Sequence, residues 1–332
     1  MLRICALVIA LAAALAQPCL AAPRRAPPPP ADAVADADLP PPPKLTPWEG
    51  CFSQVADERI AACTIVLEEE EHETWKRMTA WIHRGVAWGQ KGEMARAIDD
   101  FERVLELEPT NVEALGNSGI AHAALKAYAT ALGFFGRAVA VDGRRPPLLA
   151  LYADALRDSG DGSAAFETYG RALAIDPEFA FAWHGRGQAW LAAGDADKAL
   201  ADFDQALRHN PSYAEAHHSR GRLLVERGHH DGAIRAFTAA IDRRPTFAGA
   251  YFNRGRAYHF KGQYQRAIAD YDKVIDLSPQ FAPAYNNRAR AHAMLGRTAA
   301  AIADLERAIA LGASDGQTLT LRAELGASPS ER

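Results

Sequence analysis

The chain has 332 residues, of which 48% are hydrophobic and 23% charged, and its formal net charge at pH 7 is -4. This charge argues against a general nucleic-acid binder, whose footprint is basic. Beyond the N-terminal segment no stretch is both apolar and long enough to span a bilayer. The alanine-rich composition agrees with an all-helical chain.

Residues 1–21 are predicted to be an export signal. Arg3 supplies the positive start, Ile4 to Ala16 is apolar and of signal-peptide length, and the end is polar with small residues. Cleavage is expected after Ala21, because cleavage after Ala22 would place a proline directly behind the broken bond. An uncleaved membrane anchor is the alternative. The chain is therefore expected in the periplasm or elsewhere in the cell envelope, with no membrane span once the signal is removed.

A proline-rich disordered linker is predicted over residues 22–47. The stretch from Pro23 to Pro47 holds ten of the twenty prolines of the chain. Such a segment cannot bury a core and is expected to be an extended spacer. Its runs Pro27–Pro30 and Pro40–Pro43 could dock a proline-reading domain, and the alternative is a simple tether.

Residues 48–77 hold the two cysteines that remain after cleavage, Cys51 and Cys63. In an oxidising compartment two such cysteines usually pair. A continuous helix would hold them about 18 Å apart, too far for a disulfide. A bridge therefore requires a turn between them, with Asp57 as the cap of a helix over Asp57–Glu69. Two buried free thiols are the alternative.

From Met78 to Asp315 the chain repeats every 34 residues without insertion or deletion. Prolines mark the period, with Gly143 replacing proline inside the series: Pro109, Pro177, Pro211, Pro245 and Pro279. A fixed period of this length is the signature of a solenoid. Seven repeats follow: 78–111, 112–145, 146–179, 180–213, 214–247, 248–281 and 282–315.

Three positions of the repeat predict close packing of two helices. Alanine occupies the first position in all seven repeats: Ala97, Ala131, Ala165, Ala199, Ala233, Ala267 and Ala301. The second is also small: Gly85, Gly119, Ala153, Gly187, Gly221, Gly255 and Ala289. The third is large and is expected to fill the space between repeats: Phe101, Phe135, Tyr169, Phe203, Phe237, Tyr271 and Leu305.

The ends of the helices are marked by glycine and proline. The first helix of a repeat is expected to stop at a left-handed glycine, at 92, 160, 194, 228, 262 and 296. The proline after the second helix prevents its continuation. Repeats two and three are the least regular, because Lys126 replaces the turn glycine and Gly143 the proline. A local bend or weaker packing is expected there.

The pattern resembles the tetratricopeptide repeat (TPR) family, on the residues Trp183, Gly187, Trp190, Ala199, Phe203, Ala206 and Pro211. The resemblance implies an all-α, right-handed superhelix of about seven helix-turn-helix repeats whose first helices line a concave groove. Residues 48–77 are then an N-terminal capping half-repeat. Residues 316–332 are a C-terminal capping helix and tail, with Leu321 and Leu325 on one face.

An arginine position in the first helices is expected to form ion pairs with aspartates sixteen residues later. The predicted pairs are Arg84–Asp100, Arg186–Asp202, Arg254–Asp270 and Arg288–Asp304. The two repeats without this arginine also lack the aspartate, which favours a structural pair between the two helices of a repeat. Arg220 is expected to lack a partner, because Ala236 stands in place of its aspartate.

The groove is the predicted binding surface. Trp183, Gly187 and Trp190 share the inward face of their helix, and residues one step on are rotated by about 100° onto the concave side that the family uses. The candidate groove residues are His184, Gln188, His218, Arg222, Phe252, Arg256, His259, Phe260, Asn286 and Arg290. Arginines bordered by aromatic rings favour an extended peptide that is acidic or bears carboxylates. The alternative is that the arginines pair with Glu226 or neighbouring acids.

The family's lysine and asparagine clamp for a terminal carboxylate is not reproduced, because its lysine positions are His184, His218, Phe252 and Asn286. Adjacent histidines on a helix point about 100° apart, so no metal site is expected, and no cofactor is predicted. The sequence contains no P-loop or H-E-x-x-H motif.

The sequence therefore predicts a non-catalytic interaction scaffold that binds a protein or peptide in its groove. The alternative is a structural adaptor of a cell-envelope assembly that acts through its convex face or by self-association. An enzyme is the remote alternative.

Overall fold

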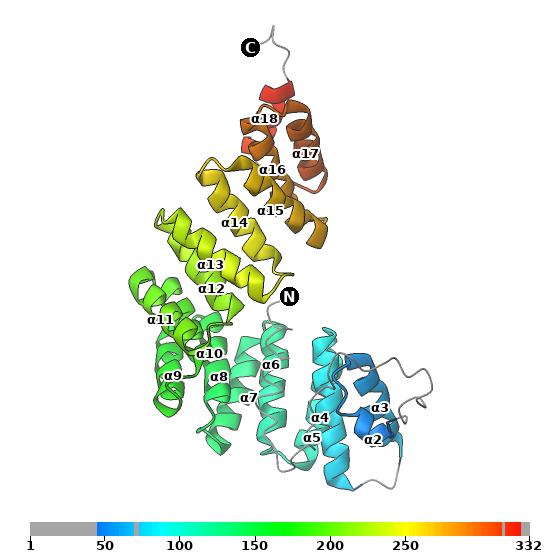
Figure 1. The fold of residues 1–332 in the computed structure, drawn as a ribbon. Coiled ribbons are helices and arrows are strands. Elements are labelled where there is room, and N and C mark those ends of the chain that lie inside the picture. The colour runs from blue at the N-terminus through cyan, green and yellow to red at the C-terminus, as the bar shows by residue number, and fades with distance from the viewer. Residues whose placement is uncertain (1–44, 70–72, 314–315, 327–332) are drawn as a thin grey trace, which may run out of the picture. The chain divides into compact units, whose positions relative to one another are not determined.

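The computed structural model describes residues 45–69, 73–313 and 316–326 (Figure 1). The predicted export signal and most of the predicted linker lie outside these residues. Seventeen helices and no strand are present in the described ranges, which confirms the all-α prediction. None of these helices is long and apolar enough to cross a membrane.

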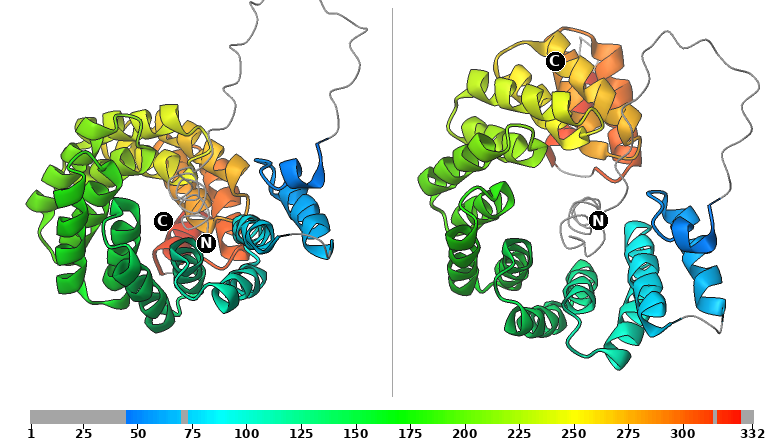
Figure 2. Two further views of the ribbon diagram at one scale, coloured as in Figure 1. Left: turned by 90° about the horizontal axis from the view of Figure 1, so that it is seen from below. Right: turned by 60° about the horizontal axis from the view of Figure 1, so that its bottom comes forward.

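The chain divides between Pro177 and Glu178 into two compact units. The first unit contains α2 (Pro47–Gly50), α3 (Ala56–Glu68), α4 (Thr74–Gln90), α5 (Met94–Leu107), α6 (Val112–Ala124), α7 (Tyr128–Val141), α8 (Pro146–Ser159) and α9 (Gly162–Ile175). The second contains α10 (Ala180–Ala192), α11 (Ala196–His209), α12 (Ala214–Glu226), α13 (His230–Arg243), α14 (Ala248–Phe260), α15 (Tyr264–Leu277), α16 (Ala282–Met294), α17 (Thr298–Ala310) and α18 (Gly316–Gly326). Within each unit every helix packs against the next helix in sequence (Figure 2).

The turn inside each helix pair uses left-handed backbone, as expected. The six predicted glycines have positive φ, between 70° and 97°, as does Gly312 after α17, at the end of the last repeat. Lys126 has the same conformation, with φ 61°, although it carries a side chain. The second repeat therefore keeps the turn that its sequence does not favour.

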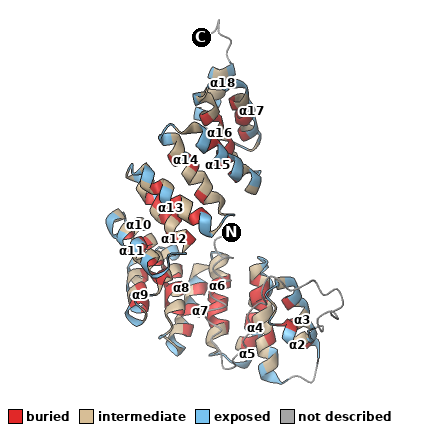
Figure 3. Ribbon diagram, in the orientation of Figure 1, coloured by how far each residue is buried: buried red, intermediate tan, exposed pale blue. Residues whose placement is uncertain are grey.

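The small and large positions of the repeat meet inside each helix pair. A Cβ atom added to Gly187 would lie 2.6 Å from Phe203 Cε1, and the same clash recurs in four other pairs: Gly85–Phe101, Gly119–Phe135, Gly221–Phe237 and Gly255–Tyr271. The large ring thus lies over the glycine of its own repeat, and it also contacts the next repeat, as Phe203 contacts Leu223. The alanine that all seven repeats share, from Ala97 to Ala301, is buried in every repeat. Buried residues recur along the paired helices (Figure 3).

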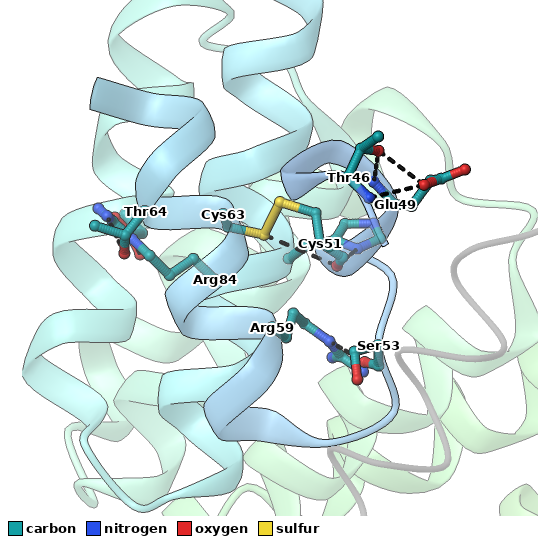
Figure 4. The surroundings of a disulfide bond; sticks show 10 residues. Thr46, Glu49, Cys51, Ser53, Arg59, Cys63, Thr64 and Arg84 are labelled. Atoms are coloured by element: carbon teal, nitrogen blue, oxygen red, sulfur yellow. Dashed lines mark hydrogen bonds and ion pairs between the residues drawn. A yellow bond between two sulfur atoms is a disulfide. The ribbon is translucent and has the colours of Figure 1, made fainter. Parts of the chain in front are cut away.

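The N-terminal cap is held by a disulfide between Cys51, which follows α2, and Cys63 in α3 (Figure 4). A turn between the helices brings the two Cα atoms to 4.9 Å. The expectation that Asp57 caps the second helix is wrong, because α3 begins at Ala56 and its N-cap is Val55. The N–H of Val55 instead donates to Ser53 Oγ at 3.1 Å, and Asp57 pairs with Lys91, the residue that follows α4.

The predicted linker ends too late. The helix α2 begins at Pro47, where proline fits the first helical position because its missing N–H would be unbonded there. Thr46 and Glu49 form a reciprocal capping box around this start. The ordered cap therefore starts inside the predicted 22–47 segment.

At the other end α18 packs on α17. Thr318 is buried, and Leu321 and Leu325 are half-buried. Arg322 donates to Glu306 of α17 at 2.6 Å. This helix has the position that the first helix of an eighth repeat would take.

Candidate binding groove

The four predicted ion pairs are present as two-pronged contacts. Each arginine donates from Nε and Nη2 to both carboxylate oxygens of its aspartate, over 2.6 to 2.9 Å. All four aspartates are buried. Burial raises the pKa of Asp100 and Asp270, and the hydrogen bonds from Arg84 and Arg254 oppose that rise. These side chains join the two helices of a repeat and are not exposed for a ligand.

The expectation that Arg220 lacks a partner is wrong. Its Nε donates to Asp204 Oδ1 at 2.7 Å, which lies sixteen residues earlier and in the preceding helix, α11. Arg288 makes the same backward contact to Asp272, in addition to its pair with Asp304. Within a unit, the first helix of a repeat packs against its own second helix and against the second helix of the preceding repeat. A carboxylate on the preceding helix can therefore replace the missing aspartate.

Three candidate groove residues hold successive first helices together. His184 Nε2 lies 3.1 Å from Ser219 Oγ, and Gln188 Nε2 donates to the same oxygen at 2.8 Å. His218 is only 5% exposed, and its Nε2 lies 2.9 Å from Asn253 Nδ2. The prediction that these three residues lie on an open face is therefore wrong. The first helix of the following repeat covers this edge of α10 and of α12.

Two further candidates are half-buried. Phe252 packs on Phe281 and Tyr271, with ring centroids 5.3 and 6.0 Å away. Asn286 Oδ1 is buried and has no hydrogen-bond partner in the described part of the chain. Both side chains line the boundary between repeats and are less accessible than the sequence suggested.

The exposed part of the predicted groove lies on α12 and α14. Arg222 and Arg256 are exposed at equivalent positions one repeat apart, and neither makes a hydrogen bond or ion pair with any described residue. The pairing of Arg222 with Glu226, the alternative reading, is thus not formed. Phe260 is 59% exposed and stacks its ring on His230, with centroids 5.3 Å apart.

Arg290 continues this line but is occupied by the C-terminal helix. Its Nη2 donates to Gln317 Oε1 of α18 at 3.0 Å, and both residues line a hollow of about 600 Å³. Nearby, burial lowers the pKa of His259, and the positive charge of Arg290 lowers it further. His259 therefore contributes a neutral ring beside the arginines at neutral pH.

Asp154 of α8 occupies the position in the third repeat that is equivalent to Arg222 in the fifth. Arg157 Nη1 donates to Asp154 Oδ1 at 2.6 Å, and Tyr169 donates to the same oxygen. Burial raises the pKa of Asp154, and the charge of Arg157 opposes this. The 34-residue alignment alone would have shown that this position changes sign between repeats.

No described residues form a group of three or more histidine, cysteine, aspartate or glutamate side chains able to hold a metal ion. The candidate groove residues of the second unit carry cationic, aromatic and amide side chains. Such groups suit the recognition of carboxylates and extended backbone.

Comparison with known proteins gives matches to models of the tetratricopeptide repeat. One model matches residues 84–147, 218–280 and 260–316, and a second matches residues 180–213. Together the matches cover more than half of the chain. No curated protein sequence matches it.

Solved structures share the fold. The APC/C hetero-tetramer Cut9-Hcn1 gives a TM-score of 0.64 at 15% identity, covering 82% of this chain and 53% of that chain, so this chain spans about half of its length. A tetratricopeptide repeat protein from Parabacteroides merdae gives 0.52 at 23% identity, over 75% of this chain and 98% of that one. Pseudomonas aeruginosa pilF gives 0.53 at 18% identity, over 61% and 92%. At identities this low, the structural matches show that the fold is shared and nothing further.

Seven consecutive helix pairs with small residues at their contacts define an α-solenoid, the class of scaffold on which proteins and peptides are bound. Within this class the chain belongs to the tetratricopeptide repeat family.

Proposed function

We propose that this protein is a non-catalytic scaffold that binds an extended, acidic peptide segment of a partner protein along α12 and α14. The observation that carries the proposal is the pair of exposed arginines, Arg222 and Arg256. They lie one repeat apart and make no hydrogen bond or ion pair within the described residues. A peptide with carboxylates at matching intervals would supply the missing partners.

The neighbouring side chains support an extended ligand. Phe260 offers an exposed ring, and Phe252 and His259 are half-buried beside the arginines. Arg290 could join the site only by releasing Gln317, so we assign it to the rim. Because the face spans two repeats, the ligand must be extended or must present carboxylates over a comparable length.

Export to the periplasm belongs to the same proposal and rests on the composition of residues 1–21. The bridge between Cys51 and Cys63 is compatible with an oxidising compartment. Detection of the protein in periplasmic extract, shortened to begin at Ala22, would test this part. Retention of the intact signal in the cytoplasm would contradict it.

The binding proposal is tested by reversing charge in the groove. Pull-downs from cell-envelope extract would use the chain from Ala22 onward, an Arg222→Glu/Arg256→Glu variant, and an Arg208→Glu/Arg243→Glu control. The control makes the same charge change at two exposed arginines of second helices. We expect the groove variant alone to lose the partner, with equal helix content by circular dichroism. Equal capture by all three proteins would refute the groove as the site.

A second candidate, an adaptor acting through its outer surface, is favoured by one observation in the first unit. Leu107, Val141 and Ile175 recur at 34-residue spacing at the ends of α5, α7 and α9, and their exposed fractions are 53%, 49% and 44%. Sedimentation of the chain with and without Val141→Glu tests self-association through this line. A monomer at all concentrations would remove self-association from consideration.

A further inference from the structure

The fifth repeat differs from its neighbours where a buried aspartate normally holds the arginine of the first helix. Repeats four, six and seven have aspartate there: Asp202, Asp270 and Asp304. The fifth repeat has Ala236, which is buried. Arg220 consequently makes a single hydrogen bond, from Nε to Asp204. Among the described residues its Nη atoms have no hydrogen-bond partner, unlike those of the four arginines in two-pronged pairs.

A surface hollow of about 570 Å³ lies beside Arg220. It is bounded by Leu200 of α11, by Leu224 and Arg227 of α12, and by the start of α13 with Arg235. The floor is therefore partly aliphatic, and three guanidinium groups surround it. A small polar ligand could be held by the rim while its non-polar part rests on the leucines.

Positive charge exceeds negative charge around this hollow. Arg227 pairs with Asp197, whose side chain is 90% exposed, and such surface pairs are weak. Arg235 is exposed and makes no hydrogen bond or ion pair with any described residue. Asp231 is the one carboxylate in the lining, and Lys261 neutralises it from outside. An anion entering the hollow would meet the unbonded Nη atoms of Arg220, whose Nε is held by Asp204, and the guanidinium of Arg235, which also interacts with Asp231.

The start of α13 adds hydrogen-bond donors to the same hollow. Its N-cap, His229, makes no side-chain capping bond, and the His230 N–H donates to Gly228 O, so the N–H groups of Asp231 and Gly232 remain for a ligand. His230 Nδ1 is buried and lacks a hydrogen-bond partner within the described ranges. The ring of His230 is held by stacking on Phe260. The hollow thus combines backbone N–H donors with guanidinium groups.

We propose that this hollow, defined by Arg220, Arg227, Arg235, His229 and His230, binds the phosphoryl group of a small phosphate ester. A phosphoryl group carries about two negative charges near neutral pH and presents three acceptor oxygens, which matches several arginine donors and the N-terminus of a helix. The site does not contain Arg222 or Arg256 of the groove and adjoins the groove where His230 stacks on Phe260. Its origin is the loss of the aspartate at Ala236, which leaves Arg220 without a two-pronged partner.

Isothermal titration with inorganic phosphate and with glycerol 3-phosphate tests the proposal on the chain from Ala22 onward. Arg235→Gln removes a rim donor, and Arg243→Gln makes the same change at the other end of α13, outside the hollow. We expect saturable binding to the parent chain and to Arg243→Gln, and affinity lower by about tenfold or more for Arg235→Gln. Absence of saturable binding to the parent, or equal binding by the two variants, would overturn the proposal.

Ala236→Asp tests the origin of the site. Restoring the aspartate should recruit Arg220 into the pair seen in the other repeats and weaken phosphate binding at least several-fold. Circular dichroism would establish that this variant is folded. Unchanged affinity in a folded Ala236→Asp protein would exclude Arg220 from the site, and an unfolded variant leaves the decision to the Arg235 comparison.

Discussion

At the residue scale, five of the seven helix pairs place a large ring directly over a glycine of the same repeat. Gly187 lies so near Phe203 that a methyl group would clash with the ring at 2.6 Å. The seventh repeat solves the same problem differently, with Ala289 opposite Leu305, both fully buried. The third repeat has Ala153 and Tyr169 at these positions, both fully buried, so its helices pack around a methyl group and a large ring.

Gly187→Ala is expected to destabilise the chain by about 1 to 3 kcal/mol, because the core must shift to admit the methyl group. Gly170→Ala is the control, since a Cβ there meets nothing within 4 Å, and should stabilise by about 0.5 to 1 kcal/mol. Adding Phe203→Leu to Gly187→Ala should recover part of the loss. Urea denaturation followed by circular dichroism measures all three. Equal shifts for Gly187→Ala and Gly170→Ala would contradict the packing argument.

The buried ion pairs make a second prediction at this scale. Arg254→Ala leaves Asp270 buried without its guanidinium and should cost on the order of 3 kcal/mol. In the Arg254→Ala/Asp270→Ala double variant, losing Asp270 should cost little more. A double-mutant cycle measures this coupling, and strict additivity would rule it out.

The same variant should depend on pH in a defined direction. Burial already raises the pKa of Asp270, and removing Arg254 removes the opposing effect. The folded pKa then lies further above the unfolded value, so stability is retained at low pH and lost as pH rises through the folded pKa. The penalty of Arg254→Ala should therefore be larger at pH 7 than near about pH 4. A penalty independent of pH would show that Asp270 is not the group responsible.

At the element scale, the helix pairs are defined by their turns. Six helix pairs turn through a glycine at positive φ, and the pair of the second repeat turns through Lys126. A side chain in this conformation costs roughly 1 to 2 kcal/mol relative to ordinary backbone. The second repeat tolerates that cost because its helices are packed on both sides by α5 and α8.

Lys126→Gly is expected to stabilise the chain by about 1 kcal/mol. The reverse change, Gly262→Lys, places the same side chain at the equivalent turn of the sixth repeat and should destabilise by a similar amount. Thermal unfolding by circular dichroism compares the pair. If both changes shift the midpoint in the same direction, backbone strain at residue 126 is not the cause.

At the scale of the whole molecule, each repeat depends on its neighbours rather than on one central core. The disulfide at the N-terminal end therefore acts locally. Cys51→Ser/Cys63→Ser should reduce the stability of the cap by about 3 kcal/mol. The bridge joins residues 12 positions apart, and closing a loop of about 15 residues contributes about 3 kcal/mol.

Hydrogen exchange provides the measurement. Faster exchange is expected in residues 45–69 of the variant, with a smaller effect in α4, and the second unit should be unchanged. Faster exchange throughout residues 178–326 would contradict local action. An unchanged cap would show that the packing of Trp48 and Val66 is sufficient without the bridge.

The sequence predicted the period of 34 residues and the glycines at the turns. It also predicted the small residues at the helix contacts and the two-pronged ion pairs such as Arg254–Asp270. Each depends on residues within one repeat, and seven copies make a local rule visible. The sequence also required a turn between Cys51 and Cys63, since helix rise and disulfide reach are local quantities.

Contacts between repeats were decided only by the tertiary structure. The burial of His218 against Asn253, the backward pair of Arg220 with Asp204 and the capture of Arg290 by Gln317 each join residues from different repeats. The periodic pattern says which face a side chain occupies, whereas the rotation between neighbouring repeats sets how far that face is covered. That rotation results from the packing of many side chains and cannot be derived from the pattern of one repeat. Because it covers most of the predicted groove residues, the exposed arginines of α12 and α14 are the main part that stays accessible.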